Sequence, residues 1–151
     1  MEISIGDSNS AKAENLKNDL MLWESVKSDF LKFNSKLEGH TEFEEKQLFQ
    51  FIREHVKPDT HKLLFPVHFQ SLHEQHDSVI PNITQKLVSC FQGQPQKQWT
   101  QVIEHLKEFQ NELFQHLLIE ERGLVMPWLN WDDTLYATYR TYLSWKFAPM
   151  Y

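Results

Sequence analysis

Apolar residues recur along most of this chain every three or four positions, which is the spacing of one face of an α-helix. Three stretches rich in Pro, Gly, Asp or Asn interrupt this pattern, at residues 56–60, 92–95 and 130–134. Stretches of this kind end one helix and cap the next. They predict helices over residues 28–55, 60–91 and 96–123, and a shorter one over residues 132–148.

A further apolar stripe of helical spacing precedes these helices, and it consists of Leu16, Leu20 and Trp23. It predicts a helix that begins near Ala11. If this helix ran on unbroken to residue 55 it would be about 65 Å long, which is long for a bundle built from this chain. Because serine and aspartate near residue 28 cap helices well, we expect the chain to turn near residues 24–28.

The patterns together favour one class of fold. No stretch alternates as a strand would, and no linker divides the 151 residues. We expect an all-α protein, an antiparallel four-helix bundle with an additional short, aromatic C-terminal helix. We expect a single domain over residues 1–151, with a loose N-terminus at residues 1–10 and the C-terminal helix at residues 132–148.

Composition narrows the range of partners. The formal net charge of −6 argues against a nucleic-acid partner. No apolar run is long enough to span a membrane, and the N-terminus lacks the basic start and apolar core of a signal peptide. The single cysteine, Cys90, excludes an internal disulfide and suits a reducing compartment. We therefore expect a cytoplasmic protein.

The residues of this chain best suited to bind a metal ion lie in a motif that occurs twice. His40 stands four residues before Glu44, which is followed by a second acid, and His116 stands in the same way before Glu120. Positions four apart lie on one face of a helix, one turn from each other. Each copy therefore directs an imidazole and a carboxylate into one small volume, on the apolar face of its helix.

The helix between the two copies adds His73 and His76 on its inner face. Glu44 stands about 11 residues before the end of its predicted helix, and His73 about 13 residues into the next, so antiparallel packing sets them at similar heights. Imidazole suits iron, manganese, zinc and copper, and carboxylates can bridge two ions. The pattern predicts a metal site, with Glu44 and Glu120 as bridges between two ions. The candidate ligands are His40, Glu44, His73, His76, His116 and Glu120.

Two positions in this set stay open. His73 is either a ligand or a hydrogen-bonded core histidine, and Glu112, four residues before His116, is an alternative to Glu120. The second acids, Glu45 and Glu121, stand about 100° round the helix, where they face solvent or support the ligands. The remaining histidines are expected at the surface or its boundary, and they are His55, His61, His68 and His105.

These motifs resemble the hemerythrin-like, HHE cation-binding family. The likeness rests on His40-x3-Glu44-Glu45, on Leu72-His-Glu-Gln-His76 and on His116-x3-Glu120-Glu121 followed by Leu-Val-Met-Pro-Trp-Leu, in that order. It covers roughly residues 30–129. The resemblance implies a four-helix bundle that holds a non-heme di-iron centre through those histidines and acids. It also implies a small-molecule partner such as O2, NO or peroxide, which the protein carries, senses or reduces.

The chain departs from the family's pattern in one respect. The family usually supplies a further histidine from its first helix, and this chain has no histidine before His40. A ligand-poor iron position would favour binding of an exogenous small molecule, or would hold a single ion weakly. Two classes of function therefore stay open: a di-iron protein that binds a small oxidant, as carrier, sensor or oxidase, and a helical-bundle interaction or iron-handling protein whose metal is structural, partial or absent.

Overall fold

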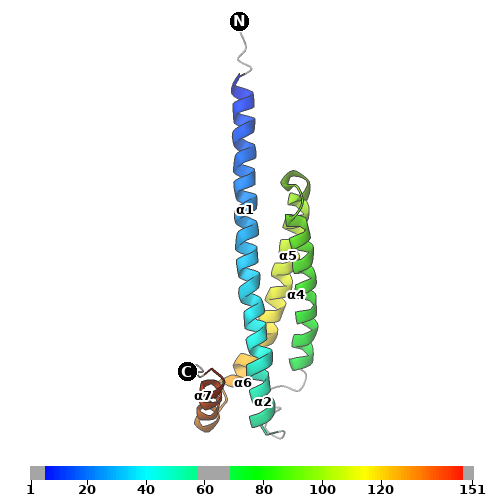
Figure 1. Cartoon of the computed structure of the whole chain (residues 1–151). Coiled ribbons are helices and arrows are strands. Elements are labelled where there is room, and N and C mark those ends of the chain that lie inside the picture. The colour runs from blue at the N-terminus through cyan, green and yellow to red at the C-terminus, as the bar shows by residue number, and fades with distance from the viewer. Residues whose placement is uncertain (1–5, 58–68, 148–151) are drawn as a thin grey trace.

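The computed structural model describes residues 6–57 and 69–147. Its elements in chain order are α1 (Gly6–Phe43), the π-helical turn η1 (Glu44–Leu48), α2 (Phe49–His55), α4 (Phe69–Phe91), α5 (Pro95–Glu120), the π-helical turn η2 (Glu121–Val125), α6 (Met126–Trp128) and α7 (Asp133–Phe147) (Figure 1). The described residues contain no β-strand. The predicted all-α four-helix bundle is confirmed, with four helical rods: α1–η1–α2, α4, α5–η2–α6 and α7.

The first rod is longer than predicted. Helix α1 begins at Gly6 and passes residues 24–28 without a break, so the predicted turn there is wrong. Serine and aspartate inside a helix each cost less than about 1 kcal/mol relative to alanine. Trp23 and Phe30, seven residues apart on one face of α1, are both buried. A straight helix lets both rings pack at once, and this burial outweighs the cost of the polar residues between them.

The other predicted boundaries hold in part. Helix α4 ends at Phe91, as predicted, while its expected start at residue 60 lies outside the described residues. The fourth predicted helix does not end at residue 123, because the π-helical turn and α6 carry it on to Trp128. The predicted last helix is confirmed as α7, and the backbone N–H of Leu135 donates to Asp132 Oδ1 at 2.7 Å. That hydrogen bond caps its first turn.

Helices α1 and α5 run in the same direction, and α4 runs opposite to both (Figure 1). Two ring contacts fix their register: Trp23 lies against Trp99 at 5.0 Å, and Phe33 against Phe109 at 6.0 Å. Both pairs are 76 residues apart in the sequence. A residue on α1 therefore stands level with the residue 76 positions later on α5. This register also places the two His-x3-Glu motifs level with each other.

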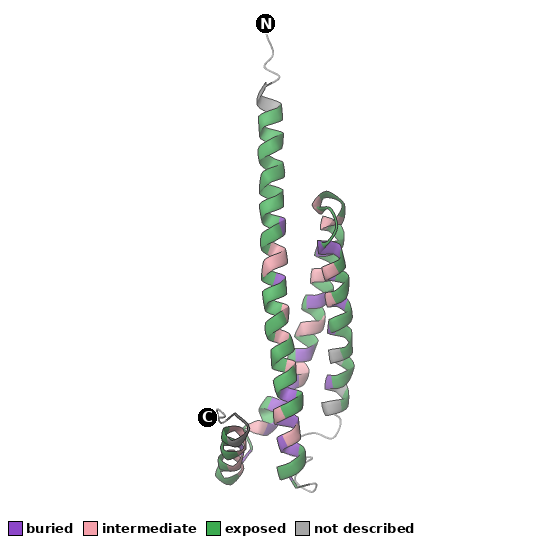
Figure 2. Ribbon diagram, viewed as in Figure 1, coloured by how far each residue is buried: buried purple, intermediate pink, exposed green. Residues whose placement is uncertain are grey.

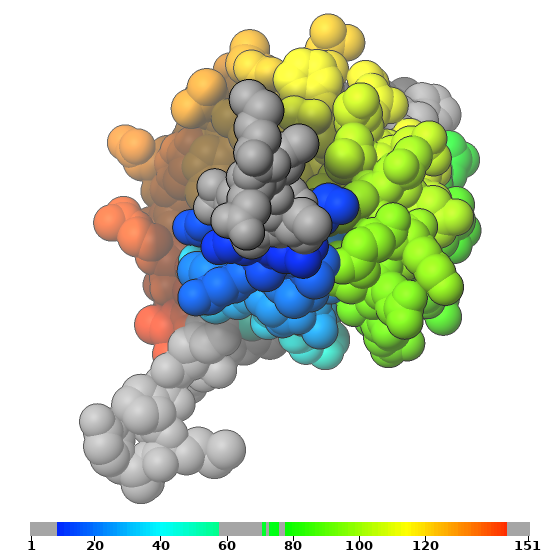
Figure 3. All heavy atoms as spheres, turned by 90° about the horizontal axis from the view of Figure 1, so that it is seen from above, coloured from blue at the N-terminus to red at the C-terminus, as the bar shows by residue number. Residues whose placement is uncertain are grey.

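Two apolar cores lie above and below this level. The upper core joins α1, α4 and α5, and its buried residues are Trp23, Phe30, Ile80, Ile83, Leu87, Cys90, Phe91, Val102 and Phe109. The lower core joins α2, η2 and α7, and its buried residues are Leu48, Phe49, Phe51, Ile52, Val56, Leu124, Trp131 and Tyr139. Seen along α1 from its N-terminal end, the α4–α5 hairpin and α7 lie on opposite sides of the rod (Figure 3).

The upper part of α1 is exposed along its whole described length. Every residue from Asn9 to Leu22 is exposed, and Trp23 is the first buried position (Figure 2). Leu16 and Leu20, predicted to face inward, are 45% and 43% exposed. By the register of the two helices Pro95, where α5 begins, stands level with Asp19. Most of this exposed segment therefore lies beyond the end of the α4–α5 hairpin.

Candidate metal centre

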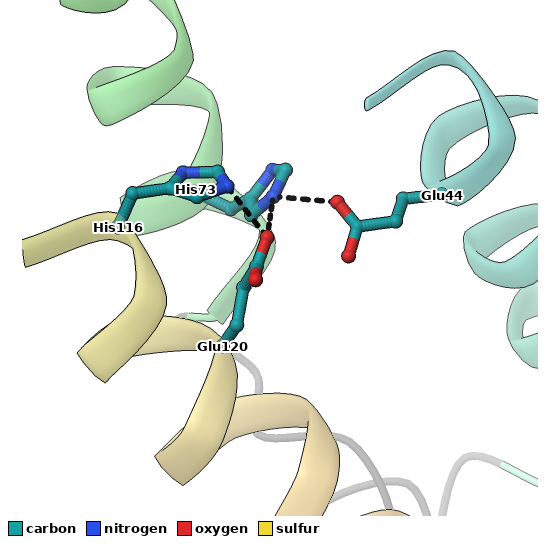
Figure 4. A group of neighbouring side chains, drawn as sticks. All are labelled: Glu44, His73, His116 and Glu120. Atoms are coloured by element: carbon teal, nitrogen blue, oxygen red, sulfur yellow. Dashed lines mark hydrogen bonds and ion pairs between the residues drawn. The ribbon is translucent and has the colours of Figure 1, made fainter. Parts of the chain in front are cut away.

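Four buried side chains from three helical rods meet between the two cores. Glu44 comes from the start of η1, His73 from α4, and His116 and Glu120 from the end of α5 (Figure 4). One nitrogen or oxygen atom from each lies within 4.8 Å of all the others. The exposed fractions of these residues are between 0% and 7%. The arrangement gathers two imidazoles and two carboxylates that are each buried.

The closest approaches centre on one carboxylate oxygen. Glu120 Oε1 lies 2.5 Å from Nε2 of His116 and 3.3 Å from Nε2 of His73. Nε2 of His40 is 3.7 Å from the same oxygen, and 3.3 Å from Glu44 Oε1. The second carboxylate is reached by His73 as well, whose Nε2 lies 3.2 Å from Glu44 Oε2. The Nε2 atoms of three histidines thus point at the same small volume.

A π-helical turn comes directly after each motif. In η1 the backbone N–H of Phe49 donates to the carbonyl of Glu44, and in η2 that of Met126 donates to Glu121, five residues earlier in both cases. Such a turn inserts one extra residue and rotates the later part of the helix relative to the earlier part. Each turn therefore lets the motif face the site while the residues after it face the lower core. Single π-helical turns inside α-helices are frequent at functional sites.

Burial and neighbouring side chains shift the pKa values of the two carboxyls in opposite directions. Burial raises the pKa of Glu44 above its ordinary value, and the hydrogen bond with His73 offsets only part of that rise. Burial also opposes ionisation of Glu120, but the contacts with His116 and His73 outweigh it and hold the pKa of that carboxyl well below its usual range. A neutral imidazole has one N–H to donate, and Nε2 of His73 faces both carboxylates. A positive ion between them would stabilise both charges.

The spacing of these donor atoms fits a metal ion. Ligand atoms held roughly 2.1 Å from an ion stand about 3 Å apart when adjacent and about 4.2 Å apart when opposite. The separations of 3.2 and 3.3 Å, and the limit of 4.8 Å for the whole set, lie close to that range, while Glu120 Oε1 and His116 Nε2 are closer, at 2.5 Å. Mixed imidazole and carboxylate donors suit iron, manganese and zinc. The donor set therefore supports a transition-metal site.

The structure brings together five of the six predicted candidates. Glu44, His73, His116 and Glu120 form the buried group, and His40 reaches both carboxylates while its side chain is 50% exposed. His76 lies in α4, but its side chain is outside the part of the structure that is described. His73 is at the centre of the group, with Nε2 3.2 Å from Glu44 Oε2 and 3.3 Å from Glu120 Oε1.

The positions considered as alternatives lie apart from this group. Among the described side chains that gather here, Glu120 is present and Glu112 is not. Glu45 and Glu121 are exposed, in agreement with the solvent-facing interpretation. His105 is half-buried, with Nδ1 3.3 Å from Glu108 Oε2, and His55 is exposed at the end of α2. His61 and His68 lie outside the described residues.

Two features of the site were missed by sequence reasoning. The ring of Phe49 meets that of His73 edge to face at 5.2 Å, which closes the lower side of the site. The π-helical turn that turns Phe49 inward was not foreseen either. No signal in the sequence indicates this turn, because buried Leu48 stands four residues after Glu44, as a regular helix favours.

A sequence model of the hemerythrin HHE cation binding domain matches residues 6–129 of this chain. The chain belongs to that family. The predicted resemblance is thereby confirmed, and the match extends to α1 and the whole of α5. Neither a curated protein nor a solved structure matches the chain. No helix among the described residues is both long and apolar enough to cross a membrane. Family membership and the buried donor group both point to a metal-binding site.

Proposed function

We propose that this hemerythrin-like domain holds a non-heme di-iron centre and binds O2 or a related small oxidant there, as a carrier, sensor or oxidase. The observation that carries the proposal is the approach of three histidine Nε2 atoms to a pair of buried carboxylates, one from each motif. Paired inward-facing carboxylates and histidines in a helical bundle suit two ions rather than one. A bound iron pair supplies the electrons and the open coordination positions for a small oxidant.

Within this proposal each side chain has a role. Glu44 and Glu120 would hold the ions as shared carboxylates, since an oxygen of each lies 3.2 or 3.3 Å from Nε2 of His73. His116 and His73 would hold them from the buried side, and His40 from the exposed side. His76 is the sixth candidate of the predicted set. The half-exposed His40 marks the side by which a small molecule reaches the centre.

Metal analysis of the purified protein tests the proposal. After expression in iron-rich medium we expect about two iron ions per chain, with near-ultraviolet absorption from the ferric pair. His116→Ala and His40→Ala should each lose most of this iron. His105→Ala is a matched control on α5, because its ring contacts Glu108 outside the site, and it should keep the iron. Full iron in both site variants would refute the assignment.

The alternative function, a helical bundle with a structural metal ion, predicts a different response to small oxidants. A structural ion would tie α1, α4 and α5 together between the two cores, and would not change with small molecules. The test exposes the reduced protein to O2, NO and peroxide and records absorption spectra. Spectral change with at least one of them supports the proposed function. Iron that is retained without any such change supports a structural role.

A further inference from the structure

The N-terminal end of α1 is exposed along its described length up to Trp23. From Asn9 to Leu22 all 14 residues are exposed, and an isolated helix of that length is marginal in water. Its exposed apolar side chains are Leu16, Leu20, Met21 and Leu22, at 45%, 43%, 64% and 56%. Leu16 and Leu20 continue the stripe that is buried from Trp23 onward. The segment therefore carries an apolar face that the described part of its own chain does not cover.

A second exposed apolar face lies lower down, beside the contact between α1 and α5. Phe33 touches Phe109 of α5, yet 44% of it is exposed. Leu22 stands eleven residues before Phe33, close to three helical turns, so the two share one side of α1. On α5, Ile103 is 47% exposed, and the register of the two helices places it between the levels of Leu22 and Phe33. In a helical bundle a further helix packs along such a face.

The segment cannot reach this face in its own chain. Helix α1 is continuous from Gly6 to Phe43, so residues 9–22 point away from the bundle along the rod (Figure 1). We propose that the segment Asn9–Leu22 docks in a second copy of the chain, along the side of α1 and α5 that carries Phe33 and Ile103. By two-fold symmetry the second copy returns the same segment, so that two such exchanges form one dimer.

Charge favours a second copy as the occupant. The segment carries Lys12 and Lys17 together with Glu14 and Asp19, so it is neutral although the chain carries a net charge of −6. Two copies can therefore lie antiparallel through this part without net repulsion between the exchanged segments. The same chain also supplies both apolar faces, which satisfies the requirement of a two-fold interface. This inference does not depend on which metal or small molecule the centre binds.

Sedimentation of the full-length, metal-loaded protein tests the exchange. Wild type should sediment as a dimer, with twice the mass of the 18.1 kDa chain. Leu16→Lys/Leu20→Lys changes the segment and Phe33→Lys/Ile103→Lys changes the face that receives it. Each pair should raise the dimer dissociation constant on the order of 100-fold or more. Met126→Lys is the matched control, because it is 56% exposed on α6 away from both faces, and it should remain dimeric.

A cross-link distinguishes exchange from other arrangements. In a Cys90→Ala background, one chain carries Ala13→Cys and another carries Ile103→Cys, and the two are mixed and treated with a short thiol cross-linker. Within one chain Ile103 stands level with residue 27 of α1, which is 14 residues from Ala13 and therefore about 21 Å away along the helix axis. Exchange should give a cross-linked dimer of the two different chains. Three results would each overturn the proposal: a monomeric wild type, a dimer unchanged by either lysine pair, or a cross-link confined to single chains that carry both cysteines.

Discussion

The His40–Glu44 pair on α1 and the His116–Glu120 pair on α5 share one motif, but only the second is closed off from solvent. Both pairs have the same spacing, and a π-helical turn comes after each. His116 is 1% exposed, while the side chain of His40 is 50% exposed. The two carboxyls differ as well, because the pKa of Glu120 is lowered and that of Glu44 is raised.

The difference comes from the neighbours of each helix. His116 lies beside the ring of His73, at 4.6 Å, where α4 and α5 pack along their whole hairpin. The half-exposed His40 lies on a side of α1 that the described helices leave open to solvent. A motif of five residues fixes the direction in which its ligand atoms point. The packing of other helices decides whether those atoms are withdrawn from water, and hence how strongly each group depends on its partner.

The largest effect is expected from changing the length of the turn that the two halves share. Inserting an alanine after Glu45 adds a residue that η1 does not accommodate, and should rotate all later residues of the rod by about 100°. Phe49, Phe51 and Ile52 would then turn away from the lower core, and each contributes about 2 kcal/mol by burial. We expect a loss of about 5 kcal/mol in the free energy of unfolding, measured by urea denaturation.

Glu45→Ala is the matched control for the insertion. It places an alanine at the same exposed part of the turn without adding a residue, so its stability should stay close to that of wild type. An insertion variant that unfolds at the urea concentration of the control would show that the length of this turn does not position the lower core.

Without metal, replacing His116 should destabilise the protein more than replacing His40, and both losses should be smaller than that of the insertion variant. His116→Ala leaves the buried Glu120 carboxylate without its closest partner, at a cost of about 3 kcal/mol. His40→Ala removes a half-exposed partner, and should cost less than about 1 kcal/mol because water takes its place. Urea unfolding after chelation measures both. Equal losses would mean that exposure does not control the strength of these contacts.

These contrasts also mark how far the sequence could predict the site. The heights of Glu44 and His73 came from counting residues to the loop between their helices, and the observed distance between His73 Nε2 and Glu44 Oε2 is 3.2 Å. The motif spacing likewise predicted that both carboxylates face inward. Both predictions depend on helix geometry alone, which is the same wherever a regular helix forms.

Other features depended on tertiary packing, and the sequence could not predict them. Caps near residue 28 favoured a turn, yet Trp23 and Phe30 bury together only on a straight helix. The exposure of His40 depends on which side of α1 is left uncovered, and no local pattern encodes that. A π-helical turn likewise costs little locally and is selected by the packing of the residues after it, such as Phe49 against His73.

Replacing each carboxylate by an amide should reveal their opposite environments. The lowered pKa of Glu120 stabilises the fold above pH 4.5, and this contribution is lost as pH falls. The raised pKa of Glu44 has the opposite sign, since ionising it in the fold costs free energy as pH rises above 4.5. At pH 7 and without metal, Glu120→Gln should lose about 2 kcal/mol, and Glu44→Gln should be as stable as wild type or more so. Urea unfolding checks both values, and the reverse order would contradict the assigned directions.

The smallest effects are expected at the second acid of each motif. Glu45 and Glu121 come directly after the bridging residues, but a helix turns by about 100° per residue and both side chains are exposed. Glu45→Gln and Glu121→Gln should therefore keep the wild-type iron content and change stability by less than about 0.5 kcal/mol. Metal analysis and urea unfolding of each variant check this. Iron loss in either would place the second acid among the ligands, and the two halves of the site would then differ in their ligands as well as in their exposure.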